Sequence, residues 1–210
     1  AEDGIRDCLL SRGLGDVYKR QIYDNNYFND RYQGVPIGGF TQMFEKMLDG
    51  IEVKLNQDYF KDKNHYDSIA EKVVYTGCID EFFDYKYGEL GYRSLRFETG
   101  VLDMENYQGC AVINQCDHTE EYTRTVEHKH FEKVKTDHTV ITREYPIEYK
   151  RGMVPYYPIN TKENSEMYDK YRKESKTLTN IIFGGRLAEY KYMDMHIVIE
   201  SAMNKFRSAQ

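Results

Sequence analysis

The sequence contains no tryptophan, only four prolines and four cysteines, and no long apolar run in its 210 residues. Without roughly eighteen consecutive apolar residues it has no stretch able to span a bilayer, so we do not expect a membrane protein. The cysteines form no CxxC pair and no regular framework, and they stand at Cys8, Cys78, Cys110 and Cys116. This excludes a disulfide scaffold and fits reduced thiols in the cytoplasm, where we expect the protein.

Positive charge is also scarce, because 29 lysines and arginines face 35 aspartates and glutamates. The resulting net charge of -6 argues against nonspecific binding of nucleic acid, which requires clustered basic residues. Tyrosine, in contrast, occurs twenty times. Its flat apolar ring and hydroxyl suit stacking on a base or sugar while hydrogen-bonding an edge, although many of these residues must simply pack. The overall composition is that of a globular protein of one domain or somewhat more.

The most informative stretch, residues 180–196, reads NIIFGGRLAEYKYMDMH. It predicts a short apolar strand, a turn at Gly184 and Gly185, and one amphipathic helix that continues to Phe206. Such a junction is typical of a ligand cradle, because the free N–H groups at a helix start favour negative charge. We expect the apolar residues of the last helix to pack in the core, namely Ile197, Ile199, Ala202, Met203 and Phe206.

Periodicity predicts further elements along the chain. Helices are expected at 40–48, ended by Gly50, and at 163–176, and a half-buried strand at 51–55. A second strand is expected at 72–77. A mixed sheet is expected from antiparallel strands at 92–98, 111–114, 122–130 and 139–144.

The EHKH run at 127–130 would set His128 and His130 on one face of a strand. Zinc requires three or four convergent ligands, and no third candidate stands at a motif spacing. We therefore expect no metal site, and we assign both histidines to cross-strand hydrogen bonds and packing.

The run GGRLAEYKYMDMH (184–196) closely resembles the C-terminal flavin and substrate segment of the bacterial UDP-galactopyranose mutase family. The resemblance covers 22–210 and extends through NNYFNDRYQGVPIGG (25–39), YTGCIDEFFDYKYGELGYRSLRFE (75–98), YTRTVEHKHFE (122–132) and VPYYPIN (154–160). It implies a mixed α/β fold, the C-terminal part of an FAD-dependent Rossmann-like flavoprotein, with the N-terminal GxGxxG half absent. Residues 1–21 resemble a translated sequencing adapter, and we exclude them as an extraneous segment.

The same resemblance implies an isomerase that interconverts UDP-galactopyranose and UDP-galactofuranose for galactofuranose-containing cell-surface polysaccharides. The implied cofactor is FAD, active in its reduced form, with flavin N5 attacking the anomeric carbon as UDP leaves. We expect UDP-galactose and UDP-galactofuranose as partners, and neither nucleic acid nor a membrane. The resemblance is also compatible with a homodimer. We expect a chain of this extent to be inactive by itself.

Residue roles follow from the matching motifs. Catalytic roles carry over to Arg124, which would face the diphosphate, and to Asp194, beside the sugar. Substrate-binding roles carry over to Tyr27, Phe28, Asn114, Arg124, Tyr157 and Tyr192. Flavin contacts carry over to Val53, Thr76, Gly77, Gly184, Gly185, Arg186 and Met195. From the pattern alone, Arg124 is a surface charge, Val53 a core residue and Asp194 a helix N-cap.

Two other classes of function remain open. A flavin-dependent amine-oxidase-like oxidoreductase shares the strand, glycine turn and helix, but it has no use for a diphosphate clamp. A non-catalytic nucleotide-sugar binding module would use the aromatic residues without flavin, so its affinity for UDP would not depend on a flavin redox state.

Overall fold

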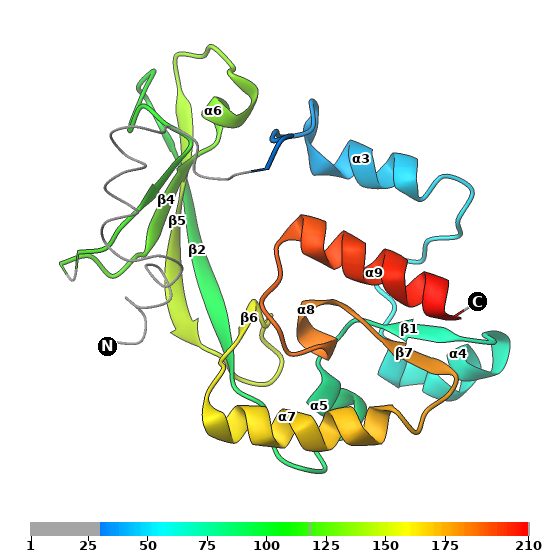
Figure 1. Ribbon diagram of the computed structural model, residues 1–210. Helices are drawn as coiled ribbons and strands as arrows, with labels where there is room; N and C mark the ends of the chain where they lie inside the picture. The colour runs from blue at the N-terminus through cyan, green and yellow to red at the C-terminus, as the bar shows by residue number, and fades with distance from the viewer. Residues whose placement is uncertain (1–29, 118, 210) are drawn as a thin grey trace. The chain divides into compact units, whose positions relative to one another are not determined.

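The computed structural model describes residues 30–117 and 119–209, which form two compact units (Figure 1). The first unit holds the described residues up to Val53 together with Glu98–Arg143, and the second holds Lys54–Phe97 and the chain from Glu144 onwards. Strands β2 (Tyr92–Leu102) and β5 (Thr139–Glu148) continue from one unit into the other. Tyr27, Phe28 and the segment 1–21 lie outside the described residues.

The larger sheet has five strands in the order β3-β4-β5-β2-β6, with β3 at Val112–Asn114, β4 at Arg124–Glu127 and β6 at Tyr157–Pro158. Strands β3 and β4 are antiparallel, and so are β2 and β6. The strands predicted at 92–98, 111–114 and 139–144 are confirmed, and the first and last of them run four residues further than expected. Together with the helices, these strands confirm the expected mixed α/β class.

The strand predicted at 122–130 is wrong in its second half. β4 ends at Glu127, whose N–H donates to the Ala111 carbonyl at 2.9 Å, and no further pairing with β3 continues beyond this point. The chain turns instead into helix α6 (Lys129–Glu132). His128 keeps a cross-strand bond, since its Nε2 lies 2.7 Å from Thr142 Oγ1, but His130 lies in α6 and does not share a strand face with it.

Helix α3 (Gly39–Met47) in the first unit confirms the helix predicted at 40–48. None of its residues is buried. The half-buried strand predicted at 51–55 is wrong, because all five residues are exposed and no described strand pairs with them. Alternation indicates a face to bury, but a strand also needs a neighbour for its backbone hydrogen bonds. Val53 is 51% exposed and is therefore not a core residue.

Two short parallel strands organise the second unit. β1 (Val73–Tyr75) and β7 (Ile181–Phe183) confirm the strands predicted at 72–77 and directly before the glycine turn. The two strands pair in parallel, and Figure 1 shows them side by side. Aromatic rings pack around this pair, because the Phe82 ring centroid lies 4.9 Å from that of Tyr75 and 4.8 Å from that of Phe183. Phe82 ends helix α5 (Ile79–Phe82), and the same cluster receives Tyr59 from the 3-10 helix η1 (Tyr59–Asp62), which precedes α4 (Lys63–Ile69).

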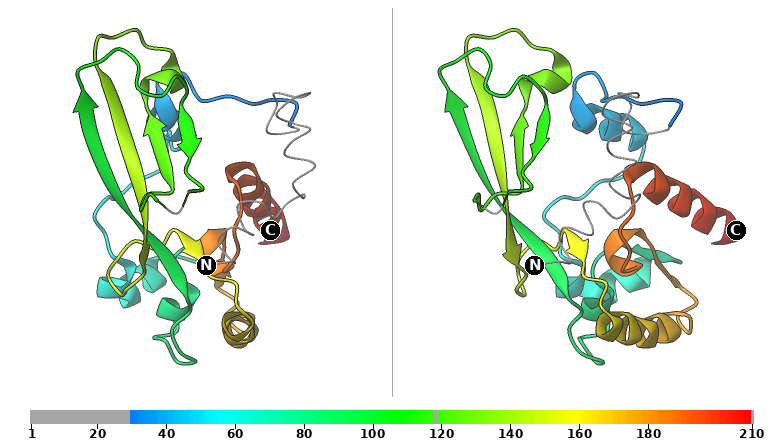
Figure 2. Two further views of the ribbon diagram at one scale, coloured as in Figure 1. Left: turned by 90° about the vertical axis from the view of Figure 1, so that its left-hand side faces the viewer. Right: turned by 60° about the vertical axis from the view of Figure 1, so that its left-hand side comes forward.

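Helix α7 (Lys162–Ser175) confirms the surface helix predicted at 163–176. Thr161 caps its start, with Oγ1 accepting the Asn164 N–H at 3.2 Å. Tyr171 is completely buried and packs on Phe83, whereas nearly all charged residues of α7 are exposed. Figure 2 shows the helix from two further sides. No helix in the described chain is both long enough and apolar enough to span a membrane.

The single helix predicted after the glycine turn is wrong, because the chain forms α8 (Gly185–Ala188) and then a separate α9 (Met195–Ala209). α8 ends in a Schellman motif: the Lys191 N–H donates to the Arg186 carbonyl at 3.0 Å, and the Tyr190 N–H to the Leu187 carbonyl at 3.3 Å. Tyr190 takes the left-handed position of this motif, with φ of 46°. Glycine usually occupies that position, so the sequence carried no stop signal here.

The expected burial of α9 is also wrong. Ile199, Met203 and Phe206 are 48%, 51% and 65% exposed, and Ile197 and Ala202 are exposed as well. The apolar spacing correctly predicts an amphipathic helix, but spacing does not say whether another element covers its apolar face. No described part of the second unit covers this face of α9.

Candidate functional site

Arg124 and Asn114 lie directly opposite each other on β4 and β3. Arg124 Nε donates to Asn114 Oδ1 at 2.9 Å, so the structure brings these two predicted site residues together in the first unit. Strand alternation places Arg124 and Val126 on one face of β4 and the buried residues Thr125 and Glu127 on the other. The guanidinium and the amide therefore share one face of the sheet, opposite the buried face.

Glu127 anchors that buried face. Its carboxylate accepts hydrogen bonds from the backbone N–H groups of Tyr107 at 3.0 Å and Gln108 at 2.8 Å, and from the Thr139 hydroxyl at 2.7 Å. His130 Nε2 lies 3.1 Å from the same carboxylate, and Glu127 itself has no exposed side-chain surface. One carboxylate thus ties β4 to β5, to α6 and to the loop before β3.

Burial of Glu127 acts to raise the pKa of its carboxyl, but hydrogen bonds from Thr139, Gln108, Tyr107 and His130 outweigh burial and lower the pKa to about 2. Because the ordinary value is 4.5, this carboxylate stabilises the fold above about pH 4.5 and loses its contribution as the pH falls toward 2. We expect urea unfolding at pH 3 to give a free energy lower than at pH 6, with on the order of 2 kcal/mol due to Glu127. In a Glu127→Gln chain, the free energy of unfolding should fall less between pH 6 and pH 3. An equal fall in both chains would show that Glu127 does not cause it.

In the second unit, Arg186, Tyr157 and Tyr192 form a compact cluster, which we call the arginine–tyrosine trio. The Arg186 guanidinium carbon lies 4.4 Å from the Tyr192 ring centroid and 5.6 Å from that of Tyr157. The two ring centroids are 6.2 Å apart. The structure therefore gathers a predicted flavin contact and two tyrosines predicted to bind substrate in one place.

The guanidinium of the trio is partly unsatisfied. Nε and Nη2 of Arg186 are buried, and neither has a hydrogen-bond partner among the described residues. A buried charged donor without a partner costs free energy, so this position favours a ligand with a negatively charged hydrogen-bond acceptor. Arginine presents its donors in a planar fork that matches phosphate or carboxylate oxygens.

The predicted glycine contacts follow the carboxyl ends of the two parallel strands. Thr76 and Gly77 come directly after β1, and Gly184 and Gly185 come directly after β7. The Gly184 N–H donates to the Tyr75 carbonyl at 3.1 Å, and Gly185 has φ of 84°, a conformation that disfavours other residues. The two turns adjoin, since a Cβ placed on Gly185 would lie 3.7 Å from Thr76 Cβ.

The remaining predicted residues are more exposed. Asp194 directly precedes α9, and its carbonyl accepts the Val198 N–H at 3.0 Å, which is the position of an N-cap residue. Met195 begins α9 and is 64% exposed. Val53 belongs to the first unit, with Arg124 and Asn114.

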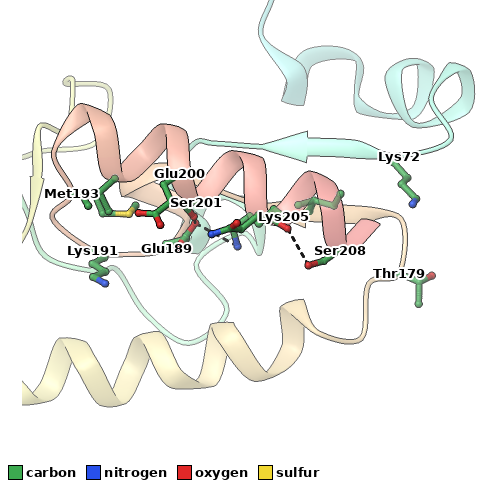
Figure 3. A pocket seen from close by; sticks show the side chains of 12 residues that line it. Lys72, Thr179, Glu189, Lys191, Met193, Glu200, Ser201, Lys205 and Ser208 are labelled. Atoms are coloured by element: carbon green, nitrogen blue, oxygen red, sulfur yellow. Dashed lines mark hydrogen bonds and ion pairs between the residues drawn. The ribbon is translucent and has the colours of Figure 1, made fainter. Parts of the chain in front are cut away.

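A cavity of about 730 Å3 lies beside α9 (Figure 3). Lys205 Nζ lies 3.4 Å from Glu189 Oε1, and the Ser201 hydroxyl donates to the same oxygen at 3.1 Å. The other charged residues of the lining are Lys72, Lys191 and Glu200. None of the described residues that line this cavity is a predicted site residue, so we do not assign the site to it.

Sequence reasoning missed two residues that organise these clusters. Glu127 was considered only as part of a metal pattern, although a charged residue on the face opposite Arg124 was a usable signal for a buried anchor. Tyr190 lies in the 184–196 run, and no prediction from the sequence assigns it a role. Its left-handed backbone has no signature in the sequence, because glycine or asparagine is the usual residue there.

Comparison with known proteins gives a consistent result. A family model described as UDP-galactopyranose mutase matches residues 10–192. A dTDP-fucopyranose mutase from Escherichia coli is 36% identical over 187 residues, which cover 86% of this chain and 50% of the relative. A probable UDP-galactopyranose mutase from Klebsiella pneumoniae is 38% identical over 184 residues, covering 86% and 47%. A UDP-galactopyranose mutase from Mycoplasma pneumoniae is 35% identical over 212 residues, covering 91% and 52%. The chain thus spans about half the length of the curated relatives it matches.

Proposed function

We propose, from the premise that this chain belongs to the UDP-galactopyranose mutase family, that it carries diphosphate- and flavin-contacting residues of an enzyme interconverting UDP-galactopyranose and UDP-galactofuranose. The observation that carries the proposal is the arginine–tyrosine trio, in which two buried nitrogens of the Arg186 guanidinium lack an acceptor among the described residues and lie beside two tyrosine rings. Such a position suits an electron-rich or anionic ligand. Arg186 and Tyr192 of the trio lie in the segment that begins immediately after β7, and Tyr157 lies in β6.

The residues present fit a flavin. In open α/β sheets, ligands bind beyond the carboxyl ends of the parallel strands, where Thr76 to Gly77 and Gly184 to Gly185 lie here. Glycine leaves room for a ring to approach the backbone, and the buried nitrogens of Arg186 favour negative charge on that ring. When bound, reduced FAD would supply the nucleophile that attacks the anomeric carbon of the sugar.

The residues of this chain have separate tasks in the proposal. Arg124, held by Asn114, neutralises charge on the diphosphate as it leaves and returns. The hydroxyls of Tyr157 and Tyr192 donate hydrogen bonds to phosphate oxygens. The Asp194 carboxylate favours positive charge that develops on the sugar. Tyr27 and Phe28 would hold the base.

A second substrate is favoured by one comparison, since the relative from Escherichia coli is named a dTDP-fucopyranose mutase. Both candidate substrates present a nucleoside diphosphate, so Arg124 and the trio do not discriminate between them. The base and the sugar differ, because thymine carries an additional methyl group and fucose lacks the 6-hydroxyl. We place UDP-galactopyranose first, because the family model and two of the three relatives described above carry that name.

Binding of UDP to this chain, followed by calorimetry, tests the diphosphate role. We expect Arg124→Ala to weaken UDP binding by about 10- to 30-fold, roughly the loss of one charge-assisted hydrogen bond, and Arg124→Lys to weaken it less. Lys135→Ala, an exposed basic residue of the same unit, is the matched control and should leave the affinity unchanged. Equal affinity of the wild-type chain and Arg124→Ala would remove Arg124 from the site.

Conversion is best measured on a chimera in which residues 30–210 replace the matching part of the Klebsiella relative. We expect it to convert UDP-galactofuranose only with dithionite, and a parallel assay with dTDP-fucofuranose decides between the two substrates. Oxidation of an amine without mutase activity would favour the amine-oxidase-like class, and UDP binding without conversion would leave a binding module. Light scattering on the same sample tests whether a homodimer forms.

A further inference from the structure

We propose that Tyr190 is a positioning residue that holds Arg186, Tyr157 and Tyr192 in one cluster. The inference rests on the proposed function, which places the arginine–tyrosine trio in the binding site. No motif assigns Tyr190 a role, and its hydroxyl makes no hydrogen bond to Arg186, Tyr157 or Tyr192.

The backbone of Tyr190 brings Tyr192 back over Arg186. Tyr190 occupies the left-handed position of the Schellman motif that ends α8, and this motif reverses the chain direction within two residues. Tyr192 comes directly after Lys191, the last residue of this motif, and its ring centroid lies 4.4 Å from the Arg186 guanidinium carbon. A side chain other than glycine at positive φ is strained, so surrounding contacts must hold it there.

The hydroxyl of Tyr190 supplies that hold. It lies 2.6 Å from the Gly91 carbonyl oxygen and 2.9 Å from the Ile159 carbonyl oxygen, and the residue is only 5% exposed. The Ile159 N–H in turn donates to the Gly91 carbonyl at 2.9 Å. Ile159 stands two residues after Tyr157, so one hydroxyl links the turn that carries Tyr192 to the segment that carries Tyr157.

The ring of Tyr190 is fixed by its neighbours. Its centroid lies 5.4 Å from that of Tyr92, edge to face, and 5.6 Å from that of Tyr168, stacked. Burial, the main cause, raises the pKa of the Tyr190 hydroxyl, so the group remains a neutral donor in the physiological range. The link is therefore present throughout the physiological pH range.

The test compares Tyr190→Phe with Tyr171→Phe. Tyr171 is a matched control, because it is completely buried in the same core and its hydroxyl donates to the Gly88 carbonyl at 2.7 Å, without a link to the trio. We expect both substitutions to lower stability to urea, since each removes a buried hydroxyl donor, and Tyr171→Phe to lower it more, because the Tyr171 hydroxyl also accepts the Tyr87 N–H at 3.0 Å. The readout that separates them is the geometry around Arg186.

That geometry is measured with arginine labelled with 15N, using Arg186→Lys to assign the Nε–H signal of Arg186. We expect this signal to carry a ring-current shift from Tyr192, to lose it in Tyr190→Phe and to keep it in Tyr171→Phe. UDP affinity should fall about tenfold in Tyr190→Phe and less than about twofold in Tyr171→Phe. Placing 4-aminophenylalanine at position 190 restores a donor and should recover both readouts.

The outcomes separate this inference from the proposed function. An Arg186 signal unchanged in Tyr190→Phe would overturn the positioning role, whether or not UDP binds. If the wild-type chain does not bind UDP but the signal moves as expected, the proposed function fails and the positioning role stands. If Tyr190→Phe does not fold, hydrogen exchange of the wild-type chain decides: the amides of Lys191 and Ile159 should open together, and independent opening would overturn the proposal.

Discussion

Replacing Glu127 with alanine should lower the free energy of unfolding by about 3–5 kcal/mol, the range for breaking a buried charged network by removing one partner. The substitution leaves the N–H groups of Tyr107 and Gln108 and the Thr139 hydroxyl without the carboxylate that accepts from them. Each donor left unpaired in a buried site costs free energy, and His130 loses the carboxylate 3.1 Å from its ring nitrogen. Urea unfolding at pH 7 measures the effect.

Two variants separate the anchor from a general loss of packing. Glu127→Gln keeps an acceptor oxygen and the shape but loses the charge, so it should cost less than Glu127→Ala. Glu132→Ala, an exposed carboxylate at the end of α6, should change stability by less than about 0.5 kcal/mol. A similar small change in Glu127→Ala would show that the hydrogen bonds to Glu127 do not support the fold of the first unit.

Replacing Gly77 with alanine should cost about 2–3 kcal/mol, even with no cofactor present. A Cβ at this position would lie 2.5 Å from Tyr75 Oη and 2.7 Å from Tyr75 Cζ, closer than such atoms approach. The Tyr75 ring cannot move away cheaply, because its hydroxyl donates to the Cys78 carbonyl at 3.1 Å and its ring packs on Phe82 at 4.9 Å. The glycine predicted as a flavin contact is thus required by its own neighbours.

Gly184→Ala is the matched control for Gly77→Ala. Gly184 has an extended backbone, and an added Cβ would meet only the Lys205 side chain, at 3.6 Å and 3.8 Å. Its free energy of unfolding should therefore change by less than about 1 kcal/mol. Equal stabilities of the two variants in urea would show that the Tyr75 ring yields, and the requirement for Gly77 would then rest on a ligand alone.

Predictions from the sequence are confirmed for elements whose own residues carry the whole hydrophobic pattern. The helix at 163–176 shows its apolar face at helical spacing, and the strands of the parallel pair read as short apolar runs, so α7, β1 and β7 are confirmed. Predictions were wrong where strand pairing or burial depends on a residue far away in the chain. The stretch 51–55 alternates like a strand but has no described partner, and α9 has an apolar face that no described residue of its unit covers.

Site residues were predicted through motifs, and the structure adds which of them meet. Arg124 with Asn114, and Arg186 with Tyr157 and Tyr192, form two clusters, and the roles assigned to them stay predictions. The supporting residues were not predictable in the same way. Glu127 and Tyr190 act through bonds to backbone groups far away in the chain, and local spacing does not record such partners.

The parallel pair of the second unit has a consequence for the order in which the chain folds during synthesis. Val73 pairs with Ile181, roughly a hundred residues later, so a long loop must close before β1 has a partner. During synthesis, the aromatic packing around β1 stays incomplete until Phe183 has left the ribosome, because its ring contacts Tyr75 and Phe82. The two glycine turns therefore come together only after the chain has been synthesised beyond Gly185, so the candidate site of the second unit forms later than β1 can be made.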